Sequence, residues 1–431
     1  MLRKIIKKFT PRPLLLFYHW FLAKLATWYY FSPSEELIVI GVTGTNGKTT
    51  TVNLISQYLE CLGEKTGIAS TVNFKVDDKE WLNNKKMTML GRFQTQKLLR
   101  QMVESGCTYA VVETSSQGIE QHRHSGINYD LVVFTNLTPE HIEAHGSFEK
   151  YRDCKERLFK HLSKSSCKNI KGKKINKTII SNADDKETAR LRETEVDKFF
   201  TYGIDQEADW QARSIDMDGG DLYFVVNDQA IKTNFLGRFN VYNVLAAIST
   251  VDALGFDLSK ASQCLLRGVP GRQEWIEEGQ NFKVMVDYAP EPESLKNLYQ
   301  ALGQISKKKL IHVLGSCGGG RDKARQPIMG KLAGQEADIV IVTNEDPYDD
   351  DPMEIINYVT KGAVEAGKQK NKNLFEILDR QDGIKKAIEL AQANDLVLIT
   401  GKGAEQFICS QAGEMIPHDD RQVVRKYLQN K

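Results

Sequence analysis

The sequence has few cysteines and no surplus of either charge. Its 431 residues include 7 cysteines, an odd number, and none of them forms a C-x-x-C pair. Neither a disulfide framework nor a structural zinc site is therefore expected, and a reducing, cytoplasmic location is favoured. The 58 Lys and Arg residues balance the 56 Asp and Glu residues to a net charge of +2, which excludes a general nucleic-acid binder.

Internal repeats and low-complexity segments are also lacking, and 41% apolar with 26% charged residues is the composition of a globular protein. Short apolar runs alternate with stretches of helical spacing from residue 37 on, and a second such block begins near residue 272. This alternation predicts an α/β fold, with a doubly wound parallel sheet in a central domain and a Rossmann-like C-terminal domain. Six lysines within residues 164–177 indicate a solvated loop. The expected limits are 1–34 for an N-terminal helical segment, 35–270 for the central domain and 271–431 for the C-terminal domain.

No acidic residue precedes Glu35, whereas six basic residues do. An apolar, aromatic-rich run covers residues 14–31 and is interrupted only by His19, Lys24 and Thr27. This combination favours a helix that lies in the interface of an anionic membrane, so a peripheral membrane contact through residues 1–31 is predicted. A helix that packs on the protein body and a membrane-spanning helix are the alternatives. The six basic residues are Arg3, Lys4, Lys7, Lys8, Arg12 and Lys24.

A glycine-containing motif, T-G-T-N-G-K-T-T, follows the first apolar run and precedes a stretch of helical spacing. Its glycines allow backbone N–H groups to surround a phosphate, and the start of the helix adds positive potential. Lys48 is expected to reach the terminal phosphate oxygens and Thr49 to hold Mg²⁺. The match to G-x-x-x-x-G-K-T is incomplete because residue 42 is valine. The motif predicts an ATP site formed by Gly44, Thr45, Asn46, Gly47, Lys48, Thr49 and Thr50.

This motif and seven further blocks resemble the Mur ligase family, in the family's order and over about residues 37–425. The resemblance is closest to the MurE type, which adds the third residue of the peptidoglycan stem peptide. It implies an ATP-dependent ligase that transfers the γ-phosphoryl group to a carboxylate of a muramoyl peptide, after which the amine of a free amino acid attacks the acyl phosphate. The blocks are residues 113–126, 133–159, 236–247, 269–276, 286–295, 315–333 and 401–406.

The resemblance assigns metal and phosphate chemistry to individual residues. Glu113 and His141 match Mg²⁺ ligands beside Thr49, although a structural hydrogen bond between a glutamate and a histidine would fit the same spacing. Lys155 matches a lysine that CO₂ carbamylates so that it supports a second Mg²⁺. From periodicity alone, Lys155 shares a helical face with Tyr151 and Phe159 and would be a plain surface lysine.

The same resemblance assigns the remaining ligands of the reaction. Asn243 matches the contact to adenine, Asp287 the contact to ribose, and Arg272 an arginine that faces the phosphates, although P-G-R alone would indicate only a turn. The positions that hold the muramoyl-peptide acceptor are Thr88, Ser116 and Arg123. The family pattern is broken by Met89, Gln117, Pro290 and Ala404, which stand where a threonine and three histidines are usual.

The amino-acid pocket departs from the type that adds diaminopimelate. That type carries D-N-P-R, whose arginine pairs with the distal carboxylate, whereas this sequence has Glu345-Asp346-Pro347-Tyr348 followed by three aspartates. Loss of the arginine and the acidic run favour lysine or ornithine over diaminopimelate. Arg321 and Glu405 match residues that hold the backbone or amine of the amino acid.

Only some forty residues precede Gly44, too few for the uridine-binding domain of the MurE type. Either uridine is held in another way or the acceptor is membrane-linked. A folylpolyglutamate- or cyanophycin-type ligase is one alternative function, and a nucleotide-binding scaffold or regulator with lapsed catalysis is another. The chain is expected to act as a monomer without nucleic acid.

Overall fold

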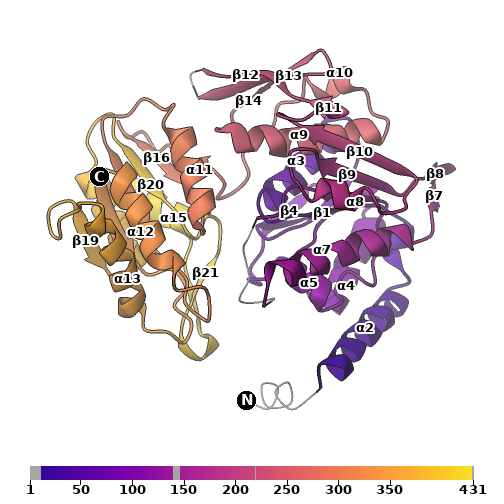
Figure 1. The fold of residues 1–431 in the computed structure, drawn as a ribbon, viewed down its shortest axis with the longest axis horizontal. Coiled ribbons are helices and arrows are strands. Elements are labelled where there is room, and N and C mark those ends of the chain that lie inside the picture. Colours follow the sequence, from indigo (N-terminus) through magenta and orange to yellow (C-terminus); the bar gives the residue numbers. More distant parts are fainter. Residues whose placement is uncertain (1–10, 139–145, 219, 430–431) are drawn as a thin grey trace. The chain divides into compact units, whose positions relative to one another are not determined.

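The computed structural model describes residues 11–138, 146–218 and 220–429. The chain divides into two compact units, each described below by itself (Figure 1). The predicted limits 1–34, 35–270 and 271–431 stay a prediction. The first unit comprises Met1–Ile215, Tyr223–Lys232 and Asn240–Leu266, and the second comprises Asp216–Leu222, Thr233–Phe239 and Arg267–Lys431.

The first unit is built on a sheet of nine described strands, with β1 near its middle. The strands from β11 to β2 run parallel, and β3 and β4 extend the sheet in antiparallel fashion. Every residue of β1, β5 and β6 is buried, as expected for strands covered on both faces. The strand order is β11 (Trp210–Gln211), β10 (Lys198–Gly203), β9 (Thr178–Asn182), β6 (Leu131–Phe134), β1 (Ile38–Thr43), β5 (Tyr109–Glu113), β2 (Thr66–Ala69), β3 (Asn73–Val76) and β4 (Lys79–Leu82).

Helices cover this sheet. α4 (Arg92–Glu104) and α7 (Phe148–Ser163) share a core with alternate residues of β1, β5 and β6, and α3 (Lys48–Cys61) packs against β1, β2 and β5. The predicted doubly wound parallel sheet is therefore confirmed. The other elements of this part of the chain are α2 (Arg12–Tyr29), η1 (Pro33–Glu35), α5 (Ser116–Glu120), α8 (Thr188–Leu191), α9 (Arg238–Ala253) and α10 (Leu258–Ala261), with a separate sheet of β12 (Arg213–Asp218), β13 (Asp221–Val226) and β14 (Gln229–Thr233).

The lysine-rich stretch 164–177 is not the solvated loop that its composition indicates. It contains a hairpin of β7 (Lys168–Ile170) and β8 (Lys173–Ile175), and two of its lysines are buried. The Lys168 and Lys177 ammonium nitrogens lie 2.5 and 3.1 Å from the carboxylate oxygens of Asp130. Asp130 pairs with both cations, and backbone carbonyl oxygens accept further hydrogen bonds from both ammonium groups, so the lysines can leave the solvent.

A disulfide framework is not expected from the sequence, and the structure contains one disulfide among its described residues. Cys61, at the end of α3, forms this disulfide with Cys264, which follows α10. The two positions are 203 residues apart in sequence and come together within the first unit. Their separation in sequence gives no sign of pairing, since disulfide connectivity does not follow from spacing.

The second unit has a six-stranded sheet among its described residues. Five strands are parallel, and β15 pairs with β16 in antiparallel fashion at one edge. α11, α12 and α13 share one core with the sheet, and α14 and α15 share another, so this unit confirms the predicted Rossmann-like domain. The sheet order is β15 (Glu274–Trp275), β16 (Lys283–Val286), β20 (Leu396–Ile399), β17 (Leu310–Leu314), β18 (Ile339–Thr343) and β19 (Leu374–Ile377). The remaining elements are α11 (Pro292–Leu302), α12 (Arg325–Glu336), α13 (Pro352–Glu365), α14 (Arg380–Leu390), α15 (Asp420–Leu428), η2 (Gln411–Gly413) and a hairpin of β21 (Phe407–Cys409) and β22 (Met415–Pro417).

Candidate active site

The predicted phosphate loop connects β1 to α3, and two of its residues have to be glycine. Gly47 has a φ of +81°, and a Cβ there would lie 2.2 Å from Oδ1 of Asn243. Gly44 has a φ of +151°, and a Cβ there would lie 1.9 Å from Oγ1 of Thr135. Both positions thus combine a backbone angle that favours glycine with neighbours that leave no room for a side chain.

Hydrogen bonds from the segment after β6 hold this loop in place. The backbone nitrogens of Thr45 and Asn46 donate to Asn136, at 2.8 Å to its carbonyl oxygen and 2.9 Å to its Oδ1. Thr135 Oγ1 donates to the Asn46 carbonyl oxygen at 2.7 Å. Lys48 Nζ donates to the Thr45 carbonyl oxygen at 2.7 Å, so the ammonium group lies over the loop. The loop is therefore preorganised for an anionic ligand.

Glu113 lies beside the loop because it ends β5, whose register places it opposite Val42 of β1. Thr49 Oγ1 donates to Glu113 Oε2 at 3.0 Å, and the Thr71 backbone nitrogen donates to the same oxygen at 2.8 Å. A hydroxyl and a carboxylate are oxygen ligands that suit Mg²⁺. The residues that the structure describes contain no cluster of three or more His, Cys, Asp or Glu that could hold a metal. His141, the other predicted ligand, lies outside the described residues.

Lys155 is not the plain surface lysine that periodicity alone indicates. Its side chain is buried on α7, and its Nζ donates to the Gly44 carbonyl oxygen at 2.6 Å. Tyr151 lies on the same helical face, with its ring centre 4.7 Å from that Nζ and its hydroxyl 3.1 Å from Thr45 Oγ1. α7 therefore brings a cation and a hydroxyl to the phosphate loop.

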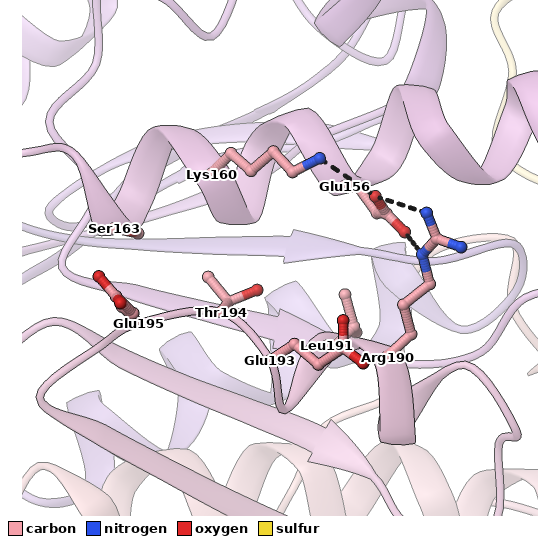
Figure 2. Close-up of a pocket in the computed structure, with 8 residues that line it drawn as sticks. All are labelled: Glu156, Lys160, Ser163, Arg190, Leu191, Glu193, Thr194 and Glu195. Carbon is pink, nitrogen blue, oxygen red and sulfur yellow. Dashed lines mark hydrogen bonds and ion pairs between the residues drawn. The ribbon is translucent and has the colours of Figure 1, made fainter.

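The outer side of α7 borders a depression of about 270 Å³, shown in Figure 2. Lys160 Nζ lies 3.4 Å from Glu156 Oε2, and Arg190 pairs with the same carboxylate. The Arg190–Glu156 pair fastens α7 to the segment that contains α8, and none of the predicted site residues lines the depression. Its lining consists of Glu156, Lys160, Ser163, Arg190, Leu191, Glu193, Thr194 and Glu195.

Hydrogen bonds connect two of the three predicted acceptor residues. Thr88 is connected to Glu113, and Arg123 to the loop that contains Thr88. Thr71 Oγ1 lies 2.9 Å from Glu113 Oε1 and 3.0 Å from Thr88 Oγ1. Arg123 donates to the carbonyl oxygen of Met89, the residue after Thr88. Thr71 thus links Glu113, whose carboxylate with the Thr49 hydroxyl would suit Mg²⁺, to the loop that contains Thr88. Sequence reasoning missed Thr71 because no motif contains it.

Ser116, the third predicted acceptor residue, begins α5, and its carbonyl oxygen accepts a hydrogen bond from Cys154 of α7 at 3.1 Å. Met89, which stands where the family usually has a threonine, packs its side chain against α5. A Cβ on Gly118 of α5 would lie 2.2 Å from the Met89 sulfur, so the methionine is seated directly on that glycine. Thr88, Ser116 and Arg123 are accordingly gathered around one loop cluster of the first unit.

The predicted nucleotide residues of the second unit lie close together. Asp287 follows β16, and its Oδ2 accepts a hydrogen bond from the Gln273 backbone nitrogen at 2.8 Å. Burial raises the pKa of Asp287, and the positive charge of Arg272 partly offsets this effect. The Arg272 guanidinium carbon lies 4.4 Å from the ring centre of Tyr288. Arg272 and Asp287 therefore belong to one compact polar group.

Two of the four predicted amino-acid residues, Asp346 and Glu405, pair with a lysine that sequence reasoning did not select. Lys402 is fully buried, and its Nζ donates to Asp346 Oδ1 at 2.9 Å and to Glu405 Oε2 at 2.7 Å. Glu345 accepts a hydrogen bond from the Cys317 thiol at 2.8 Å, and burial raises the pKa of its carboxyl. The G-K-G sequence after β20 is the signal that could have identified Lys402. Arg321, the fourth predicted residue, is exposed on the loop after β17.

Comparison with known proteins identifies the family. Residues 42–251 match the Mur ligase middle domain, and residues 271–403 match the Mur ligase, glutamate ligase domain. The chain belongs to the Mur ligase family. The predicted class of enzyme, an ATP-dependent and ADP-forming amide ligase, is confirmed by this membership.

Relatives of this Mur ligase are of the MurE type. The UDP-N-acetylmuramoyl-L-alanyl-D-glutamate–2,6-diaminopimelate ligase of Geobacillus kaustophilus (strain HTA426) is 37% identical over 413 residues, which are 94% of this chain and 81% of the relative. The UDP-N-acetylmuramyl-tripeptide synthetase of Roseiflexus sp. (strain RS-1) is 36% identical over 94% of this chain and 81% of its own. The predicted MurE type is confirmed.

Solved structures agree with this assignment. The structure of a UDP-N-acetylmuramoyl-L-alanyl-D-glutamate–2,6-diaminopimelate ligase has a TM-score of 0.60 at 30% identity and covers 91% of this chain and 78% of its own. The folylpolyglutamate synthase of Mycobacterium tuberculosis has a TM-score of 0.66 at 15% identity, over 89% of this chain and 92% of its own. The second likeness concerns the fold alone.

In this Mur ligase the acidic run after Pro347 has structural partners. Asp349 and Asp350 accept hydrogen bonds at 2.9 and 2.8 Å from the backbone nitrogens of Ala412 and Gly319. Asp351 caps α13. Tyr348, which stands in place of the D-N-P-R arginine, has a φ of +53° and packs its ring on Gly319. The aspartates of the run therefore accept hydrogen bonds from the backbone and help to hold these loops and the start of α13.

Proposed function

We propose that this Mur ligase adds an amino acid to a muramoyl peptide in peptidoglycan biosynthesis. The observation that carries the proposal is a continuous polar line in the first unit, from Thr49 through Glu113 and Thr71 to Thr88. It joins the phosphate loop to the loop proposed to hold the acceptor, which is the arrangement that phosphoryl transfer between the two substrates requires. The relatives' activity on muramoyl peptides supports the same acceptor.

The reaction is proposed to pass through an acyl phosphate. A carboxylate oxygen of the acceptor takes the γ-phosphoryl group of ATP and ADP leaves; the amine of the amino acid then attacks the acyl carbon and phosphate leaves. Backbone N–H groups of the loop and Lys48 bind the phosphates. Thr49 and Glu113, with His141, would hold Mg²⁺, which when bound offsets the repulsion between the triphosphate and the carboxylate.

Lys155 is proposed to act as a carbamate. Its neutral amine would add CO₂ and release a proton, which turns a cation into an anion beside the phosphate loop. The nitrogen keeps one hydrogen in this form and can still donate to the Gly44 carbonyl oxygen, with which it pairs at 2.6 Å. The carbamate would support a second Mg²⁺.

The nucleotide contacts of the predicted residues remain part of the proposal. Asn243, whose side chain lies against Gly47, is proposed to contact adenine. Asp287 is proposed to bind the ribose, and Arg272 the phosphates. Thr88, Ser116 and Arg123 would bind the acceptor, and Arg321, Glu345, Asp346 and Glu405 the amino acid, with Lys402 fixing the positions of Asp346 and Glu405.

Lysine or ornithine is proposed as the added amino acid in preference to diaminopimelate. The preference rests on Tyr348, which offers no cation to a second carboxylate, and not on the acidic run, whose aspartates are hydrogen-bonded. The chain is proposed to act as a monomer with a peripheral membrane contact through residues 1–31.

An amino-acid panel tests the function and the preference together. The chain is incubated with ATP, Mg²⁺, UDP-N-acetylmuramoyl-L-alanyl-D-glutamate and either lysine, ornithine or diaminopimelate, and the amide product is identified by mass. We expect product with lysine or ornithine and a gain of diaminopimelate use in Tyr348→Arg. Faster use of diaminopimelate by the unaltered chain would contradict the preference, and absence of product with all three amino acids would contradict the proposed function.

A further inference from the structure

The C-terminal half of α2 is fixed to the body of the first unit. Ala23 and Ala26 are buried, and the Thr27 side chain lies 3.2 Å from the Gly126 carbonyl oxygen. A Cβ on Gly126 would lie 2.4 Å from Thr27 Oγ1, so this glycine lets the helix approach closely. Arg100 of α4 donates to the carbonyl oxygens of Tyr30 and Phe31, just after α2, at 3.1 and 2.9 Å.

The opposite face of α2 carries large apolar side chains that the described part of the chain leaves exposed. Six of them recur every three or four residues and lie within a stripe about 100° wide, on the side away from Ala23 and Ala26. This α2 stripe consists of Leu14, Phe17, Tyr18, Phe21, Leu25 and Trp28, which are 58, 60, 53, 50, 37 and 74% exposed.

The charged residues that precede Glu35 in the sequence are all of one sign. The six basic residues that precede Glu35 include Lys24, which is exposed on α2 itself, and the five that lie at positions 3 to 12. Aromatic and aliphatic side chains next to such a cluster complement the apolar boundary and the phosphate groups of an anionic bilayer surface. None of the described helices is long and apolar enough to cross a membrane.

α2 also lies against the loop that follows α5 and contains Arg123, one of the residues proposed to bind the acceptor. Arg92, the first residue of α4, donates to the Gln121 carbonyl oxygen in that loop. Thr27 Oγ1 lies 3.2 Å from the carbonyl oxygen of Gly126, three residues after Arg123 in the same loop, so α2 and this loop are direct neighbours.

We propose that the α2 stripe docks this ligase peripherally on an anionic phospholipid surface, with the loop of Arg123 close to the lipid. The docking itself is independent of the ligase reaction. It adds to the proposed function a location at which an acceptor near the membrane would be taken up.

Vesicle binding by the full chain tests the proposal. We expect the chain to float with vesicles of phosphatidylglycerol and phosphatidylcholine, to bind vesicles of phosphatidylcholine alone far more weakly, and to be released by added salt. The triple variant Phe17→Ser, Phe21→Ser, Trp28→Ser should lose binding about tenfold or more. A matched control variant, Leu265→Ser, Ile328→Ser, Val364→Ser, alters exposed apolar residues elsewhere and should bind like the unaltered chain.

Three other results would contradict the proposed docking on a membrane. Equal binding of the triple variant and the unaltered chain would show that the stripe is not used, and absence of binding would reject the membrane as partner. Light scattering that shows a dimer of the unaltered chain, lost in the triple variant without any vesicle binding, would assign the stripe to a second copy instead. The ligase assay with the soluble acceptor keeps the proposed function separate, because the triple variant should retain that activity.

Discussion

Lys155 and Lys160 lie on the same helix but in opposite environments. Lys155 is 3% exposed and donates to the phosphate loop, whereas Lys160 has a side chain that is 67% exposed and lies 3.4 Å from Glu156. A buried lysine costs free energy unless a partner or a chemical role compensates for it. Substitutions of Lys155 and Lys160 can therefore serve as a variant and its control on the same helix, α7.

Lys155→Ala should lower the rate of amide formation about a hundredfold or more, because the group proposed to support the second Mg²⁺ is removed. Lys160→Ala should leave the rate unchanged. The unaltered chain should also lose activity in CO₂-free buffer and regain it on addition of bicarbonate. Rates that agree within about twofold for Lys155→Ala and the unaltered chain would reject the role of Lys155.

The residues of the phosphate loop could be predicted from the sequence because they are contiguous and because their chemistry follows from glycine, lysine and threonine at fixed spacing. Thr71 and Lys402 could not, since each acquires its role from partners that are distant in sequence. Thr71 meets Glu113 across 42 positions, and Lys402 meets Asp346 across 56. The burial of Lys155 depends in the same way on the Gly44 carbonyl oxygen, 111 positions away.

At the scale of elements, α12 and α13 approach so closely that glycine is required at their contact. A Cβ on Gly362 of α13 would lie 1.9 Å from the Pro327 carbonyl oxygen, and a Cβ on Gly330 of α12 would lie 1.7 Å from the Val359 carbonyl oxygen. Backbone atoms cannot yield as a flexible side chain can, so the helices would have to separate.

Gly362→Ala should therefore lower the free energy of unfolding, by about 2 kcal/mol or more, although alanine is the better helix former. The control is Gly268→Ala, where no atom lies within 4 Å of the added Cβ. Thermal unfolding followed by circular dichroism measures both variants. An unchanged midpoint for Gly362→Ala would contradict the close approach of the two helices.

The strands and helices of both sheets could be predicted from alternating apolar runs, because burial on both faces leaves a pattern in the sequence. The β7–β8 hairpin could not be predicted, since a lysine-rich stretch is typical of a solvated loop. The sequence does not reveal that Asp130 pairs with both Lys168 and Lys177. The Cys61–Cys264 disulfide could not be predicted either, since its two cysteines are 203 residues apart in sequence and meet only in the fold.

At the scale of the whole molecule, two buried groups of the second unit predict how stability depends on pH. His312 lies between the Tyr299 hydroxyl at 2.6 Å and Thr400 Oγ1 at 2.9 Å, and burial lowers its pKa to about 3. Burial alone would raise the pKa of Asp420, but pairing with Arg380 holds it below its ordinary value.

Stability should be greatest near neutral pH and should fall as the pH is lowered. Below the ordinary histidine pKa of about 6.5 the unfolded chain binds a proton at His312, whereas the folded chain binds it only below about pH 3. Between these two values the free energy of unfolding should fall by up to about 1.4 kcal/mol for each pH unit that the pH is lowered. The Asp420 contribution is lost at still lower pH. Thermal midpoints across this range measure the slope, which His312→Gln should reduce; an unchanged slope in that variant would contradict the assignment.

The most direct measurement of the central claim is the coupling of ATP hydrolysis to amide formation in the unaltered chain and in Lys48→Ala. With UDP-N-acetylmuramoyl-L-alanyl-D-glutamate, a diamino acid and Mg²⁺ present, we predict one ADP per amide bond. Omission of either substrate should stop both products, and Lys48→Ala should slow both about a hundredfold or more. Amide formation without ADP, or undiminished ADP formation by Lys48→Ala, would contradict the account.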